Sequence, residues 1–286
     1  MSLKTSLSGL ALTAVLATVL CALASAQDPP VSHYRFFGMG DWDHDGHVDL
    51  VARNPAGDLM LYPGESKRAY SQTPPIKIGN GWNGFTFFGM GDWDHDGHLD
   101  LVARNAAGDL MLYPGESQRA YSQTQPIKIG NGWNGFTFFG MGDWDHDGHL
   151  DLVARNAAGD LMLYPGESKR AYSQTQPIKI GNGWNGFTFF GMGDWDHDGH
   201  LDLVARNAAG DLMLYPGESK RAYSQTQPIK IGNGWNGFAF FGMGDWDHDG
   251  HLDLVARNTA GDLMLYPGES QRAYSQTQPI KIGNDW

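Results

Sequence analysis

The stretch DWDHDGHLD at residues 92–100 decides the fold, because nearly the same nine residues return at a fixed interval along the chain. The first aspartate of this stretch lies at positions 41, 92, 143, 194 and 245, a constant step of 51 residues. Residues 32–286 number 255, which is five units of this length with no remainder. Self-similarity at such a period indicates a repeat architecture. The five units are residues 32–82, 83–133, 134–184, 185–235 and 236–286.

Each unit predicts four short strands and no helix. In the second unit we expect strands at residues 85–90, 101–104, 110–113 and 126–130, with a hairpin turn at 105–109, because the apolar segments are short and bounded by turn residues. Four strands in about 50 residues are typical of one propeller blade. A stacked β-solenoid is the competing geometry, but its coils are usually shorter and an open stack needs atypical end caps. We therefore predict an all-β fold, a five-bladed β-propeller of four-stranded antiparallel blades.

The acidic loop at residues 92–100 predicts a metal site. Carboxylates at loop positions 1, 3 and 5 can converge on one ion if the chain curls tightly, and Gly97 at position 6 permits this curl because glycine adopts positive φ without steric cost. Position 7 offers a backbone carbonyl and position 9 a fourth carboxylate. Oxygen ligands at this density favour Ca²⁺, about one ion per blade. The alternative is a solvated acidic turn without metal, in which the carboxylates would repel one another in every unit.

The loop differs from an EF-hand, because Ala103 stands at position 12, where a bidentate glutamate would be required. Histidines at positions 4 and 7 raise the alternative of a transition-metal site, but we interpret their side chains as outward-facing spacers. The expected calcium ligands, with each histidine contributing its backbone carbonyl, are Asp41, Asp43, Asp45, His47, Asp49, Asp92, Asp94, Asp96, His98, Asp100, Asp143, Asp145, Asp147, His149, Asp151, Asp194, Asp196, Asp198, His200, Asp202, Asp245, Asp247, Asp249, His251 and Asp253.

The loop and its flanks resemble a known family. Residues 88–101, FGMGDWDHDGHLDL, resemble the FG-GAP/VCBS repeat of integrin-type propellers and of many secreted bacterial proteins. The following VARNAAGDLMLYPG, residues 102–115, is similar to the bacterial members in particular. The resemblance extends over every unit and implies a calcium-binding propeller, although relatives most often have seven blades.

A second stretch, IGNGWNGFTF at residues 129–138, is similar to the repeat of five-bladed tachylectin-type lectins, which lack a calcium loop and bind N-acetylated sugars between adjacent blades. This resemblance implies tryptophans that stack on sugar rings and asparagines that hydrogen-bond sugar hydroxyl groups. The alternative is that these tryptophans pack between blades as core, and the sequence does not separate the two. The candidate ligand-binding residues are Trp82, Asn83, Trp133, Asn134, Trp184, Asn185, Trp235 and Asn236.

Fivefold repetition favours a binding module over an enzyme. An active site brings different residues together once, whereas almost every candidate side chain here occurs five times in equivalent settings. The motifs Gly-x-Ser-x-Gly, His-Glu-x-x-His and the P-loop do not occur in the sequence. Five equivalent weak sites suit multivalent binding to repetitive glycans. The alternative is a structural or adhesive propeller that binds a surface protein without sugar specificity.

Residues 1–26 have the features of a secretory signal peptide. Lys4 is their only charge, residues 7–23 are weakly polar to apolar, and Ala24, Ser25 and Ala26 form a small-x-small cleavage signal. The apolar run is shorter than the roughly 20 residues that a membrane span prefers, which disfavours a retained anchor. We therefore expect a secreted protein with residues 27–31 as an N-terminal linker and no membrane insertion after cleavage.

Charge and cysteine content agree with a secreted, cation-binding chain. Cleavage would remove Cys21, the only cysteine, so the mature protein would have no disulfide. The net charge of -12 argues against nucleic acid and anionic membrane surfaces as partners. Bound cations would offset part of this charge.

Overall fold

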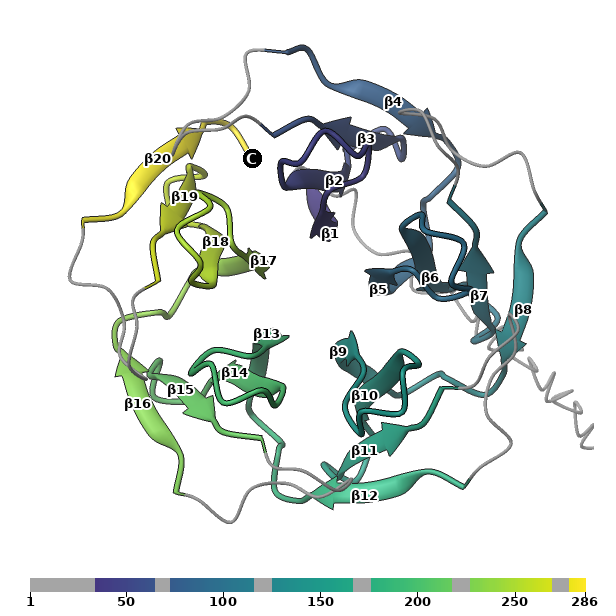
Figure 1. Ribbon diagram of the computed structural model, residues 1–286, viewed down its shortest axis with the longest axis vertical. Coiled ribbons are helices and arrows are strands. Elements are labelled where there is room, and N and C mark those ends of the chain that lie inside the picture. The colour runs from purple at the N-terminus through teal and green to yellow at the C-terminus, as the bar shows by residue number, and fades with distance from the viewer. Residues whose placement is uncertain (1–33, 65–72, 116–124, 167–175, 218–226, 269–277) are drawn as a thin grey trace, which may run out of the picture. The chain divides into compact units, whose positions relative to one another are not determined.

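The fold consists of five sheets of four antiparallel strands (Figure 1). This computed structural model describes residues 34–64, 73–115, 125–166, 176–217, 227–268 and 278–286; the predicted signal peptide and linker lie outside them. The first sheet contains, in spatial and chain order, β1 (Arg35–Gly40), β2 (Asp49–Arg53), β3 (Leu59–Tyr62) and β4 (Ile76–Gly79). The predicted five-bladed propeller of four-stranded blades is confirmed.

The other four sheets repeat this order with the same strand lengths. Their strands are β5 (Thr86–Gly91), β6 (Asp100–Arg104), β7 (Leu110–Tyr113), β8 (Ile127–Gly130), β9 (Thr137–Gly142), β10 (Asp151–Arg155), β11 (Leu161–Tyr164), β12 (Ile178–Gly181), β13 (Thr188–Gly193), β14 (Asp202–Arg206), β15 (Leu212–Tyr215), β16 (Ile229–Gly232), β17 (Ala239–Gly244), β18 (Asp253–Arg257), β19 (Leu263–Tyr266) and β20 (Ile280–Gly283).

The sheets form a closed ring. The first strands of the blades, β1, β5, β9, β13 and β17, lie around the centre, and the fourth strands lie at the rim (Figure 1). Each first strand contacts the first strand of the next blade, and β17 contacts β1. The four strands of every sheet follow one another in the sequence, so the first and last blades do not exchange a strand.

The core lies in the five interfaces between adjacent blades, which we call seams. Side chains of β6 alternate between two of them: Leu101 and Ala103 pack with residues of the first blade, whereas Val102 packs with residues of the third. Because successive residues of a strand point to opposite faces, a blade between two neighbours has both faces covered. This explains why the consecutive apolar residues Leu101, Val102 and Ala103 of β6 are all completely buried.

The last seam, between the fifth and first blades, is built like the others. Leu50, Ala52 and Tyr62 of the first blade pack there with Val255 and Trp286 of the fifth. Side-chain packing therefore closes the ring without a shared strand. In the part of the chain that the structure describes, no helix has the length and apolarity needed to cross a membrane.

Candidate metal centre in each blade

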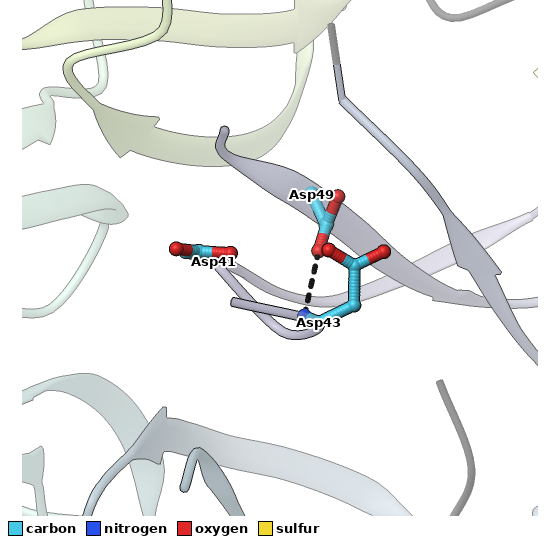
Figure 2. Close-up of side chains that lie close together, drawn as sticks. All are labelled: Asp41, Asp43 and Asp49. Carbon is cyan, nitrogen blue, oxygen red and sulfur yellow. Dashed lines mark hydrogen bonds between the residues drawn. The ribbon is translucent and has the colours of Figure 1, made fainter. Parts of the chain in front are cut away.

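The acidic loop joins the first and second strands of every blade and brings three carboxylates together. In the first blade, oxygens of Asp41, Asp43 and Asp49 all lie within 4.8 Å of one another (Figure 2). The equivalent positions 1, 3 and 9 form this triad in the third, fourth and fifth blades. In the second blade the group comprises positions 1, 3 and 5, namely Asp92, Asp94 and Asp96.

The aspartate at position 9 holds the loop in place by accepting backbone hydrogen bonds. Asp100 is the first residue of β6 and is completely buried. Its Oδ2 accepts hydrogen bonds from the backbone N–H groups of Trp93 (2.9 Å) and Asp94 (3.2 Å), and its Oδ1 accepts one from Gly115 (2.7 Å). The same three bonds form in all five blades, and the one from Asp43 to Asp49 is drawn in Figure 2. These bonds curl the loop back onto the start of the second strand.

Gly115 is glycine because the chain passes very close to the loop at this point. A Cβ at this position would lie 2.2 Å from the carbonyl oxygen of Leu99, a backbone atom that cannot move aside. The close approach is what allows the Gly115 N–H to reach Asp100. The sequence analysis missed this contact, although the Leu-Tyr-Pro-Gly segment that supplies it recurs in every unit.

Burial makes the charged form of the position-9 carboxylate unfavourable and raises its pKa. The pKa of Asp100 is raised to about 7, mainly by burial and in part by the charge of nearby Asp94, while the backbone N–H groups oppose the rise. The pKa values of Asp151 and Asp253 are likewise raised to about 7, and those of Asp49 and Asp202 to about 6. A buried carboxylate facing a second carboxylate is favoured in its charged form when a cation lies between them.

Positions 1 and 5 are held by the loop itself. In the second blade the carboxylate of Asp92 accepts hydrogen bonds from the backbone N–H groups of Asp96 and Gly97, both 3.0 Å. Asp96 in turn accepts one from the N–H of His98 at 2.9 Å. Gly97 has φ of 89°, as expected for the glycine that permits the curl. Each of these oxygens retains lone pairs that could bind a cation.

The triads fit a hard divalent cation such as calcium. Ca²⁺ binds oxygen at about 2.3–2.6 Å, so oxygens around one ion are separated by at most about 5 Å. The carboxylates of each triad meet this condition without rearrangement of the backbone. The five clusters could therefore each hold one metal ion. The clusters bring together positions 1, 3 and 9, or 1, 3 and 5 in the second blade, and ligation of calcium by these and the other predicted groups remains a prediction.

The tryptophans predicted as sugar platforms are buried. Trp82, Trp133, Trp184 and Trp235 each expose 5% of their surface and pack in the seams. Trp133, for example, packs against Phe136 and Tyr164, with ring centroids 5.1 and 4.6 Å apart. A sugar ring can stack only on an exposed aromatic face, so the structure corrects the platform interpretation and supports the core alternative. Trp93 and its equivalents at loop position 2 are buried in the same seams.

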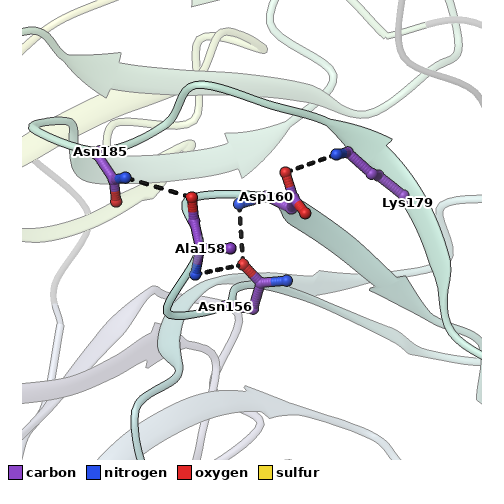
Figure 3. A network of polar contacts seen from close by, with 5 residues as sticks. All are labelled: Asn156, Ala158, Asp160, Lys179 and Asn185. Atoms are coloured by element: carbon purple, nitrogen blue, oxygen red, sulfur yellow. Dashed lines mark hydrogen bonds and ion pairs between the residues drawn. The ribbon is translucent and has the colours of Figure 1, made fainter.

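The neighbouring asparagines are exposed, and three of them bridge two blades. Asn185 begins the fourth unit, and its Nδ2 donates to the carbonyl of Ala158 in a hairpin of the third blade, at 3.3 Å (Figure 3). Within that hairpin, Asn156 Oδ1 accepts hydrogen bonds from the N–H groups of Ala158 (3.0 Å) and Asp160 (2.9 Å). Asp160 also forms an ion pair with Lys179 at 2.6 Å. These polar groups recur around the ring, and ligand binding by Asn83, Asn134, Asn185 and Asn236 remains a prediction.

Comparison with protein families gives one match that extends over most of the chain. The family described as FG-GAP-like repeat matches residues 41–103, 92–154, 143–205 and 194–256. Each match begins at position 1 of one acidic loop and ends in the second strand of the next blade, so it contains two loops. Comparison with curated proteins gives no significant match.

Proposed function

The chain belongs to the FG-GAP-like repeat family, and from this membership and its five carboxylate triads we propose that it is a calcium-stabilised binding module with ligand sites repeated around the ring. The observation that carries the proposal is the recurrence of the triad in every blade of a closed ring. Propellers built from these repeats are generally binding or structural modules rather than enzymes. We propose no catalytic role.

Calcium has a structural task in this proposal. Each ion would neutralise carboxylates that the fold holds within 4.8 Å of one another, one of them completely buried in four of the triads. Extracellular modules bind Ca²⁺ with Kd near 10⁻⁴ to 10⁻³ M. An ion present at about ten times Kd stabilises the folded state by about 1.4 kcal/mol per site, hence about 7 kcal/mol for five sites. This is comparable to the whole free energy of unfolding of an ordinary domain.

We propose a repetitive glycan as the ligand. The support is the ring of exposed asparagines, each beside a hairpin of the preceding blade, where amide groups could hydrogen-bond sugar hydroxyls. Four such weak sites on one rigid ring would gain affinity from simultaneous binding to a repetitive surface. Because the tryptophans are buried, recognition would depend on amides and backbone groups rather than on aromatic stacking.

We also propose that the protein is exported after cleavage before Gln27. The support is the sequence of residues 1–26 and the millimolar calcium found outside cells, which would fill sites of this affinity. Amino-terminal sequencing of protein recovered from culture medium tests this proposal. A product that begins at Gln27 supports export, and a chain that stays in the cell with Met1 intact contradicts it.

A glycan array probed with and without chelator tests the function. We expect binding in calcium that is lost in EDTA, together with elution by free sugar. The matched variants are Asn134→Ala and Asn185→Ala, which remove exposed amides beside a hairpin, and Gln125→Ala, which removes an exposed amide just before β8, away from the β6–β7 hairpin. The two asparagine variants should weaken glycan binding and the glutamine variant should not. Binding to no glycan in either condition would overturn the sugar proposal in favour of a protein-binding adhesion module.

A further inference from the structure

The histidines of the acidic loops form a pair across every seam. Nε2 of His95, at loop position 4 of the second blade, lies 3.1 Å from Nδ1 of His149, at loop position 7 of the third. The same two atoms are 3.0–3.2 Å apart in the other four pairs, which are His44 with His98, His146 with His200, His197 with His251, and His248 with His47. Ten histidines from five loops therefore make five equivalent pairs, one of which lies across the last seam.

The backbone holds the position-4 histidines in an uncommon conformation. His44, His95, His146, His197 and His248 have φ of 59–60°, in the left-handed region, whereas the other described non-glycine residue with positive φ is Asp285. Left-handed geometry is unfavourable for most residues with a Cβ. In each loop the histidine with this backbone conformation directs its imidazole to the position-7 histidine of the next blade.

Two imidazole nitrogens at this spacing have the chemistry of a transition-metal site. Zn²⁺ binds histidine nitrogen at about 2.0–2.1 Å, so two nitrogens in a tetrahedral shell are about 3.3 Å apart. The paired nitrogens, 3.0–3.2 Å apart, share a hydrogen bond and lie slightly closer than this, so a bound ion would take the place of the shared proton and release it to solvent. The position-4 side chains are exposed and the position-7 side chains half-buried, so an ion can reach the pair and keep water as its remaining ligands.

We propose that each histidine pair is a binding site for one borderline transition-metal ion such as Zn²⁺ or Ni²⁺, separate from the carboxylate triad. Imidazole favours these metals, whereas Ca²⁺ favours oxygen ligands, so the two kinds of site in one loop select different ions. Each ion would take one ligand from each of two blades and cross-link them. At the last seam it would join the fifth blade to the first, which no peptide bond connects directly.

The proposal is tested by titrating Ni²⁺ or Zn²⁺ into the full chain. The titration is done in saturating calcium, so that the carboxylate triads are already occupied by Ca²⁺. Isothermal titration calorimetry is expected to give about five ions per chain, because five pairs are present. His47→Gln removes one pair and should lower the number to about four. His33→Gln is the matched control, because His33 is the one histidine outside the repeated loops, and should leave it at about five.

A fivefold variant removes all the pairs with little backbone strain. It carries asparagine at residues 44, 95, 146, 197 and 248, because asparagine tolerates left-handed geometry. Transition-metal binding should be lost while calcium binding and the circular dichroism spectrum are retained. Binding of Ni²⁺ that survives in this variant, or no binding by the parent chain, overturns the proposal. Neither result bears on calcium binding, because the triads are unchanged and the calcium titration is read separately.

Discussion

Asp94 allows one calcium site to be removed in isolation. It lies at position 3 of the second loop, and its carboxylate belongs to the cluster with Asp92 and Asp96. Asp94→Asn should lower the number of calcium ions bound from about five to about four, and in saturating calcium it should reduce the free energy of unfolding by about 1–2 kcal/mol. Calcium titration by calorimetry and thermal melting measure the two effects.

The control for this prediction is Asp109→Asn. Asp109, in the β6–β7 hairpin, forms a partly exposed ion pair with Lys128 of β8, and such surface pairs contribute little to stability. It should leave both the calcium stoichiometry and the melting temperature nearly unchanged. In EDTA the two variants should melt at similar temperatures; a large deficit of Asp94→Asn that persists in EDTA would show that Asp94 acts through packing rather than through an ion.

Five buried or half-buried tyrosines predict a stability loss at alkaline pH. Burial raises the pKa of Tyr113, Tyr164, Tyr215 and Tyr266 to about 12 and that of Tyr62 further. Because the phenols ionise more readily in the unfolded chain, at about pH 10, their contribution to stability is complete below pH 10 and is lost as the pH rises towards 12. Phenolate absorbance followed alongside circular dichroism should show these groups ionising together with unfolding. Full ionisation at pH 10 in the folded protein would contradict the burial.

At the scale of elements, the first strands approach one another through glycine. A Cβ added at Gly89 in β5 would lie 2.8 Å from the Cβ of Met141 in β9, the first strand of the next blade. Gly89→Ala should therefore separate the two strands and lower the free energy of unfolding by about 1–3 kcal/mol. Adding Met141→Gly removes the Cβ, Sδ and Cε atoms that clash, so the double variant should lose less stability than the sum of the single variants. Chemical denaturation of the four proteins measures the coupling, and simple additivity would show that the contact does not limit the approach.

The strands could be predicted from the sequence because their signals are local. In the second unit the expected strand at residues 110–113 matches β7, and the others differ from β5, β6 and β8 by a single residue at one or both ends. The acidic loop was predictable for the same reason, since positions 1, 3 and 9 lie close together in the chain. The pair of His95 and His149 was not, because it joins residues of different units. The burial of Trp133 likewise depends on the third blade, whose packing a single unit does not specify.

At the scale of the whole molecule, the last seam differs from the others in a polar side chain at residue 34. Tyr34 occupies the place that Phe85, Phe136, Phe187 and Phe238 hold in the later units. Its ring lies 5.0 Å from that of Trp286 and 6.2 Å from that of Tyr62, and the Tyr34 and Tyr62 side chains share a hydrogen bond. The seam that no peptide bond spans therefore gains a polar contact within an otherwise apolar interface. Its packing is sufficient to close the ring, which implies that the position of the chain break is not essential.

Circular permutation tests whether the ring depends on where the chain is broken. Joining Trp286 directly to Ser32 reproduces the spacing of the other unit boundaries, and new termini can be placed between Trp133 and Asn134. This permutant should fold as a monomer with five calcium sites and a melting temperature within a few degrees of the parent, because each blade remains intact. Light scattering, calcium titration and thermal melting provide the comparison. A second permutant, opened between Val102 and Ala103 inside the buried strand β6, should fail to fold because it interrupts a blade. If the first permutant failed as well, packing alone would not explain how the ring is closed.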